Sequence, residues 1–183
     1  MKFLYLDGSA REDGNTATLA RQLLHNLDYS EIALRNHHIE LIVDKRHDSE
    51  GFTSRQDEYD ALLPAFLEAD YVVFSSPVYW YGISAQLKVF IDRWSESLRI
   101  VPGFQEQVKQ KKIFLVLVGG DDPQRKAQPI VQQFEYIAEF LELDLQGQLI
   151  GTGNKPGDIL HDQIALEQAR QINEQLTHIE ERV

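Results

Sequence analysis

Residues 8–16 have the types and the order of an anion-binding loop. The apolar residues before this loop predict a buried strand, and the leucines at helical spacing after it predict a helix. A helix N-terminus presents unpaired backbone N–H groups and the positive end of the helix dipole. The side chains of Ser9, Asn15 and Thr16 can donate hydrogen bonds, and the guanidinium of Arg11 can hold phosphate oxygens in a fork. The sequence therefore predicts a phosphate-binding loop, with ordinary helix caps as the alternative.

A second loop, residues 76–82, combines a proline with three consecutive aromatic residues. Pro77 has a fixed backbone angle and no N–H, which restricts the loop to one shape. Tyr79, Trp80 and Tyr81 place their rings just past a predicted buried strand. A flat aromatic ligand would fit against these rings. The alternative is that they belong to the core or to a subunit interface, where aromatic residues are common.

A third loop, residues 119–123, begins with two glycines and follows another apolar run. Five apolar runs alternate with five runs of helical spacing, and most of the apolar runs lack polar residues. This pattern predicts a parallel sheet covered by helices on both faces. The expected strands are 3–6, 39–43, 71–75, 113–118 and about 145–150, and the expected helices are 15–28, 59–67, 87–98, 130–141 and 165–179. Ligands of such sheets bind at the carboxyl ends of the strands, so the three loops are expected to share one edge.

The composition narrows the possible functions. The chain has 183 residues, 43% of them hydrophobic, and we expect one domain spanning residues 1–183. Because it has no cysteine, disulfides, thiolate metal sites, iron–sulfur clusters and cysteine nucleophiles are excluded. The formal net charge of −11 disfavours nucleic acid and anionic membranes as partners. No apolar run is long enough to span a membrane, and Asp7 comes too early for a signal-peptide core, so we expect a cytoplasmic protein.

Several weaker motifs are interpreted as structural. The segment GTGNKPG, residues 151–157, starts like a dinucleotide fingerprint but has Pro156 at the third glycine position, so it is interpreted as a turn. His37 and His38 are adjacent and would point to opposite sides of a strand, so no metal site is expected. No serine lies in a GxSxG elbow, which leaves a hydrolase triad without support.

Two long motifs carry a family resemblance. GSAREDGNT (Gly8–Thr16) and SPVYWYGISAQLKVFIDRW (Ser76–Trp94) resemble the GSxRxxGNT loop and the SPVYWxxxSxxLKxFIDR segment of the flavodoxin-like NAD(P)H-dependent FMN oxidoreductases. The resemblance implies a three-layer α/β/α sandwich whose five-stranded parallel sheet has the order 2-1-3-4-5. It also implies FMN as cofactor and NADH or NADPH as co-substrate. Iron–sulfur flavoproteins of similar pattern place their ligands between the second strand and the third helix, where this chain has no cysteine.

The resemblance assigns roles to particular residues. It implies that Ser9, Arg11, Asn15 and Thr16, with the backbone N–H of Ala17, bind the FMN phosphate, that Pro77, Val78, Tyr79 and Trp80 line the isoalloxazine ring, and that Gly119, Gly120 and Asp121 close its other side. No catalytic side chain is expected, because the flavin carries the chemistry. Arg125 and Lys126 could attract a nicotinamide phosphate, with solvated surface charges as the alternative.

The expected activity is hydride transfer from NAD(P)H through FMN to a small acceptor such as a quinone, an azo or nitro compound, or free flavin. A flavodoxin-type electron carrier is the main alternative, since an acidic protein can dock basic partners. Its phosphate loop would be rich in hydroxyls without a positive charge, unlike the loop that contains Arg11. A regulatory protein with an emptied flavin pocket is the third possibility. A homodimer is expected, because a monomer would expose residues 79–81.

Overall fold

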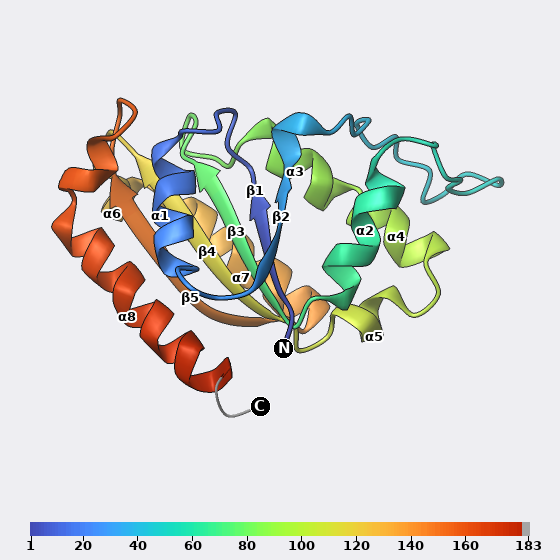
Figure 1. The fold of residues 1–183 in the computed structure, drawn as a ribbon. Helices are drawn as coiled ribbons and strands as arrows, with labels where there is room; N and C mark the ends of the chain where they lie inside the picture. The colour runs from blue at the N-terminus through green and yellow to red at the C-terminus, as the bar shows by residue number, and fades with distance from the viewer. Residues whose placement is uncertain (181–183) are drawn as a thin grey trace.

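The computed structural model describes residues 1–180, whose strands form one parallel sheet in the order β2-β1-β3-β4-β5 (Figure 1). This is the strand order that the family resemblance implies, and the prediction of a parallel sheet is confirmed. The order reverses between β1 and β3, which lie side by side at the centre. The strands are β1 (Phe3–Asp7), β2 (Tyr29–Ala33), β3 (Tyr71–Pro77), β4 (Lys112–Gly119) and β5 (Asp144–Thr152).

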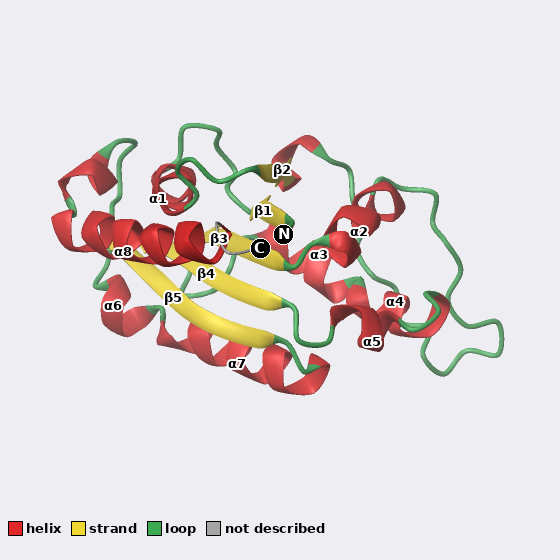
Figure 2. Ribbon diagram, turned by 60° about the horizontal axis from the view of Figure 1, so that its bottom comes forward, coloured by secondary structure: helices red, strands yellow, loops and turns green. Residues whose placement is uncertain are grey.

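Helices cover both faces of the sheet, as expected (Figure 2). The α-helices are α1 (Asn15–Leu23), α2 (Tyr59–Glu68), α3 (Ala85–Asp92), α4 (Trp94–Ile100), α5 (Phe104–Val108), α6 (Pro123–Lys126), α7 (Gln128–Leu141) and α8 (Gln163–Glu180), and the 3₁₀ helices are η1 (Leu34–Asn36) and η2 (Asp158–His161). One face packs against α1, η2 and α8. The other packs against α2, α3, α4, α5 and α7.

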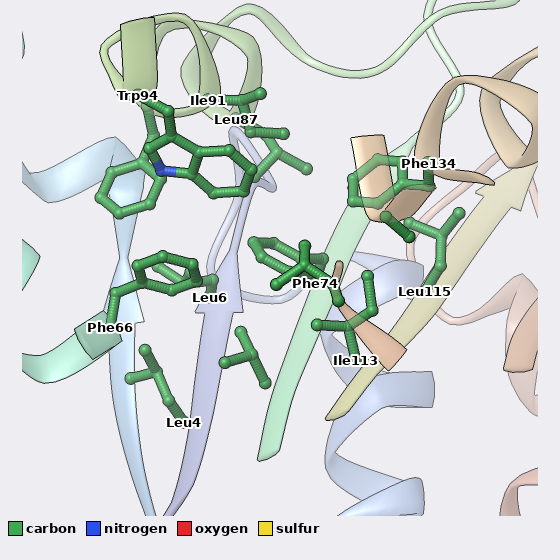
Figure 3. Close-up of a cluster of buried hydrophobic side chains, with 14 of the residues drawn as sticks. Leu4, Leu6, Phe66, Phe74, Leu87, Ile91, Trp94, Ile113, Leu115 and Phe134 are labelled. Carbon is green, nitrogen blue, oxygen red and sulfur yellow. The ribbon is translucent and has the colours of Figure 1, made fainter. Parts of the chain in front are cut away.

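The larger hydrophobic cluster is rich in aromatic side chains (Figure 3). Phe66 of α2 stacks on Trp94 of α4 with ring centroids 5.1 Å apart. Phe74 of β3 contacts Trp94 at its edge and Phe134 of α7 on the other side, at centroid distances of 6.1 and 5.5 Å. Such pairs contribute beyond the area they bury. They fix the helices of this face against the central strand β3, whose carboxyl end leads into the aromatic loop.

The predicted second strand at residues 39–43 is wrong. The strand is β2, Tyr29–Ala33, at the edge of the sheet, where Ser30 and Glu31 are exposed and Ile32 is buried. An edge strand is less covered than the central strands, so β2 includes exposed polar residues and is not apolar throughout. Residues 39–43 form an extended loop in which Leu41 is 71% exposed.

The remaining predictions differ from the structure mainly at helix ends. The helix expected at 87–98 is present as α3 and α4, which follow each other with Arg93 between them. The first helix ends at Leu23 instead of near residue 28. The short helices α5 and α6 were not predicted, because four or five residues are too few to show a helical period.

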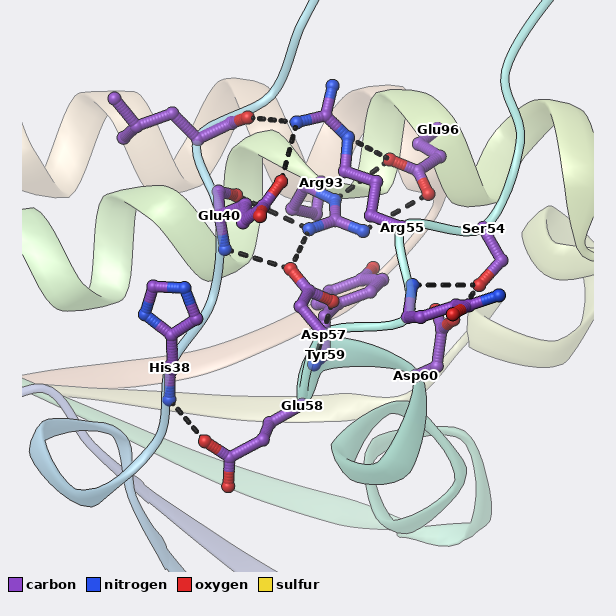
Figure 4. A network of polar contacts seen from close by, with 12 residues as sticks. His38, Glu40, Ser54, Arg55, Asp57, Glu58, Tyr59, Asp60, Arg93 and Glu96 are labelled. Atoms are coloured by element: carbon purple, nitrogen blue, oxygen red, sulfur yellow. Dashed lines mark hydrogen bonds and ion pairs between the residues drawn. The ribbon is translucent and has the colours of Figure 1, made fainter.

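The long segment between η1 and α2 is held by a buried ion-pair network (Figure 4). The guanidinium of Arg93 is fully buried and donates to Glu96 at 2.8 and 3.1 Å and to Asp57 at 2.5 Å. It also lies 4.6 Å from the ring centroid of Tyr59, whose hydroxyl is 2.7 Å from the Ser97 hydroxyl. The network therefore joins the start of α2 to α4. It also holds in place the end of the segment between η1 and α2, which contains no strand or helix.

We expect Arg93→Met to lower the free energy of unfolding by about 3 kcal/mol, because it leaves the buried carboxylate of Asp57 without its cation and leaves Glu96 with only the more distant Arg55, at 3.9 Å. Arg46→Met is the matched control, since Arg46 pairs with Asp44 at 2.7 Å on the exposed part of the same segment. Its unfolding should be close to that of the wild type. Urea denaturation of the three proteins measures both effects, and equal losses in the two variants would contradict a supporting role for the network.

Candidate active site

The loop after β1 is anchored by a buried carboxylate. Asp7 is fully buried, and its Oδ1 accepts hydrogen bonds from the Ser9 backbone N–H at 2.9 Å and from the Ser75 hydroxyl at 3.2 Å. Arg35 of η1 donates to the other oxygen, Oδ2. At Gly8 a side chain is excluded, because a Cβ atom there would lie 2.6 Å from the Ser75 carbonyl oxygen. The loop can therefore cross the end of β3 closely and in one fixed shape.

The loop ends at the N-terminus of α1, where backbone donors are left without helical partners. The first helical hydrogen bond runs from the Thr18 N–H to the Gly14 carbonyl at 3.0 Å. The N–H groups of Asn15, Thr16 and Ala17 precede it, so helix geometry gives them no acceptor within α1. No side chain caps this helix end. The helix N-terminus therefore has the free backbone donors that an anion-binding site needs.

Two side chains beside this helix end also have no partner. The Ser9 hydroxyl is buried, with the residue 3% exposed, and it makes no hydrogen bond to any described residue. The guanidinium of Arg11 is exposed and forms no ion pair within residues 1–179, whose side chains the structure describes. An unsatisfied buried hydroxyl costs about 1–3 kcal/mol unless a ligand supplies the missing partner. These donors fit the phosphate of a bound cofactor.

A cavity of about 450 Å³ opens beside these donors at the carboxyl ends of the strands. Its walls come from the loops after β1, β3, β4 and β5, and they include most of the residues predicted from the sequence. The predicted residues that line it are Ser9, Arg11, Asn15, Thr16, Pro77, Val78, Tyr79, Gly119 and Gly120. Ala17, Trp80 and Asp121 are not among the lining residues. The three loops do share one edge of the sheet, as expected.

The aromatic loop contains a tight turn in an unusual conformation. Tyr79 and Gly82 exchange two backbone hydrogen bonds of 2.9 Å, and they enclose Trp80 at φ 49° and Tyr81 at φ 63°. Two left-handed residues in succession define a turn that usually contains Asn-Gly. Each bulky residue in this conformation costs about 1 kcal/mol or more. The turn points the Trp80 side chain into solvent, 96% exposed, which is why it does not line the cavity.

Asp121 connects the aromatic turn to the glycine loop. Its carboxylate accepts hydrogen bonds from the Lys126 ammonium at 2.5 Å and from the Tyr81 hydroxyl at 3.0 Å. These two donors lower the pKa of Asp121 below its ordinary value. Arg125 pairs in turn with Asp122 at 2.8 Å. Both cations that could attract a nicotinamide phosphate are therefore paired with neighbouring carboxylates, which favours the interpretation that they are ordinary surface charges.

A fourth wall of the cavity was missed in the sequence. Residues 153–156, interpreted as part of a turn, line the cavity after the end of β5. The Asn15 side chain holds this loop, because its Nδ2 donates to the Lys155 carbonyl at 2.8 Å and its Oδ1 accepts from the Ile159 N–H at 3.3 Å. Asn15 therefore lines the cavity and acts as a clamp that connects α1 to this loop. The sequence offered one signal for this wall, because the loop follows the carboxyl end of a strand.

Gly153 allows the clamp to form, since a Cβ atom there would lie 2.8 Å from Asn15 Nδ2 and 3.2 Å from the Ile159 nitrogen. We expect Gly153→Ala to displace Asn15 from its two hydrogen bonds and to lower the free energy of unfolding by about 1–3 kcal/mol. Gly147→Ala within β5 is the control, because its Cβ would meet Phe114 at an ordinary 4.0 Å. Thermal unfolding compares the two, and equal melting temperatures would refute the clamp.

Comparison with known proteins identifies the family. Residues 1–143 match the family model described as NADPH-dependent FMN reductase. The chain belongs to this family. The membership confirms the resemblance seen in the sequence and, with it, the prediction of an FMN-dependent oxidoreductase. Residues 153–156 of the cavity wall lie beyond the matched region.

Relatives match this FMN reductase over almost its whole length. YwqN of Bacillus subtilis, named as an NAD(P)H-dependent FMN-containing oxidoreductase, is 40% identical over 174 residues, which cover 94% of this chain and 96% of that protein. An iron–sulfur flavoprotein of Methanocaldococcus jannaschii is 32% identical and covers 98% of this chain and 97% of its own. The solved structure of a Trp repressor binding protein from Bacillus subtilis superimposes with a TM-score of 0.79 at 34% identity, covering 93% and 96% of the two chains.

None of the helices up to Glu180 is long and apolar enough to cross a membrane. Within the same residues, no group of three or more histidine, aspartate or glutamate side chains is arranged to hold a metal ion.

Proposed function

We propose that this FMN reductase relative takes a hydride from NADH or NADPH and passes the electrons to a small flat acceptor, such as a quinone, an azo or nitro compound, or free flavin. The observation that carries the proposal is the buried Ser9 hydroxyl without a partner, which lies with unpaired Arg11 and the α1 N-terminus at one cavity. A phosphate monoester supplies the acceptors that all three of these features lack.

The charges around the cavity support an anionic ligand. In the described structure its only ionisable lining residues are Arg11, Tyr79 and Lys155, and no carboxylate lines it. The cavity lining thus has no acidic side chain, although the formal net charge of the whole chain is −11. Arg11 with the neutral donors of the α1 N-terminus would hold the phosphate end. The cavity lacks the carboxylates and histidines that most often act as general acid or base, which favours chemistry carried by a cofactor.

The other end of the cavity is suited to a flat ring. Pro77, Val78 and Tyr79 form one side, and Gly119 with Gly120 forms another. Gly119 packs directly on this side, since a Cβ atom there would lie 3.2 Å from the Val78 Cβ. Bound FMN would supply an isoalloxazine ring able to accept and donate a hydride. The residues of the chain would orient that ring, exclude water from one side of it and hold its phosphate.

The main rival is an electron carrier that binds FMN and turns over no small substrate. Unpaired Arg11 in the phosphate loop favours the reductase, because the carriers are expected to use hydroxyl groups without a cation. The family membership of residues 1–143 favours it as well. Steady oxidation of NAD(P)H with a small acceptor is the property that separates the two.

We expect the purified protein to bind FMN and to oxidise NADH or NADPH continuously when a quinone is added. Arg11→Ala should weaken FMN binding about ten-fold or more, because one charge-assisted contact to the phosphate is lost. Arg99→Ala removes an equally exposed cation of α4 and serves as the control. Flavin absorbance and NAD(P)H absorbance measure the two effects, with NADH and NADPH compared under anaerobic conditions.

Each competing function has its own outcome in that experiment. Bound FMN without NAD(P)H turnover over a wide range of acceptors would identify an electron carrier and refute the reductase. A colourless protein that does not bind added FMN would indicate an emptied pocket and a regulatory role.

We include in the proposal that residues 1–183 form one domain, and that the enzyme works in the cytoplasm, where NAD(P)H is available.

The proposed enzyme is a homodimer in which the partner subunit covers the aromatic turn. Trp80 is 96% exposed, and Tyr79 and Tyr81 are each 49% exposed. Three adjacent exposed rings are unusual for a monomer and are common at interfaces. The left-handed turn keeps these rings outward at a cost in backbone strain.

We expect light scattering to show a dimer for the wild type and a monomer for the double variant Trp80→Asn/Tyr81→Gly at the same concentration. Asn-Gly suits the left-handed turn, so the two substitutions should not destabilise the fold of the single subunit. Leu41→Asn, which removes an exposed apolar side chain elsewhere, should remain a dimer. A wild-type monomer at working concentration would refute this part of the proposal.

A further inference from the structure

The loop after β5 is a built part of the cavity although it lies beyond the residues that the family model matches. The Gly153 N–H donates to the Gly119 carbonyl at 3.0 Å, which joins the loop to the glycine loop after β4. The carboxylate of Asp158 accepts from the backbone N–H groups of Asn154 at 3.0 Å and Lys155 at 2.7 Å. With the clamp from Asn15 on the other side, the backbone of this loop is held at three points.

Lys155 is the charged residue of this loop. Its ammonium group forms no hydrogen bond or ion pair with any side chain or carbonyl that the structure describes. The nearest acid along the chain, Asp158, accepts hydrogen bonds from the backbone N–H groups of Lys155 and Asn154, which lower its pKa most, and the Lys155 charge lowers that pKa further without a direct contact. The main-chain carbonyl of Lys155 is bonded to Asn15, the first residue of α1. The residue is therefore tied directly to the helix end where the phosphate is proposed to bind.

We propose that Lys155 is a second cation for the FMN phosphate, in addition to Arg11, and that it strengthens the selection of phosphorylated flavin over riboflavin. This inference rests on the proposed function, because it needs FMN to occupy the cavity. An FMN phosphate carries close to two negative charges at neutral pH, and Arg11 alone leaves part of that charge uncompensated. Arginine acts as a directional fork, whereas the lysine ammonium acts as a point charge that tolerates small shifts of the phosphate.

The test compares FMN and riboflavin binding to the full chain freed of flavin, measured by quenching of flavin fluorescence at low and high NaCl. The variants are Lys155→Ala and Lys155→Arg, with Lys45→Ala as control because it removes the same charge from the distant segment between η1 and α2. We expect Lys155→Ala to weaken FMN binding about ten-fold, as the loss of one charge-assisted contact predicts. Riboflavin binding should change less than about two-fold, and the salt dependence of FMN binding should decrease.

The controls separate a role of the charge from a role of the fold. Lys155→Arg should retain FMN binding within about three-fold, and Lys45→Ala should match the wild type. FMN binding by Lys155→Ala that equals the Lys45→Ala control would overturn the inference and leave the proposed function standing. Equal losses of FMN and riboflavin would also overturn it, since they would show a displaced loop. A wild type that binds no FMN would instead refute the proposed function itself.

Discussion

The buried carboxylate of Asp7 is the constraint on which the site depends. A charge removed from water is costly unless cations and donors surround it, and here Arg35, the Ser9 N–H and the Ser75 hydroxyl supply them. These partners belong to η1, to the loop after β1 and to β3. The carboxylate thus fixes the start of the phosphate loop against both neighbours of β1, at the point where the strand order reverses. Donors that are ordered before a ligand arrives lose little entropy when it binds.

The same structure keeps negative charge away from a cavity built to receive it. Acidic side chains close to the cavity are engaged elsewhere: Asp7 inside the sheet edge, Asp121 with Lys126 and Tyr81, and Asp158 with backbone N–H groups. Each of these contacts also fixes one of the loops in the cavity wall. The same hydrogen bonds therefore position the loops and keep these carboxylates from repelling an anion in the cavity.

The strands that are apolar throughout could be predicted, because their residue types match their complete burial in the sheet. The edge strand failed because Ser30 and Glu31 face solvent, while residues 39–43 are locally more strand-like but have no strand to pair with. The site was predictable where a loop motif is long. The outward position of Trp80 could not be predicted, because no sequence pattern reveals two successive left-handed residues, and Lys155 was missed because the segment GTGNKPG was interpreted as a turn.

The segment between η1 and α2 is held in place by side chains alone. The iron–sulfur flavoprotein that is 32% identical to this chain carries a metal cluster by its name, whereas this chain has no thiolate to bind one. Here the sequence has no cysteine, and the buried cluster of Arg93, Asp57 and Glu96 holds the segment in place. The buried carboxylates of Asp57 and Glu96 are costly unless they are paired, so the position of this segment depends on the single guanidinium that lies between them.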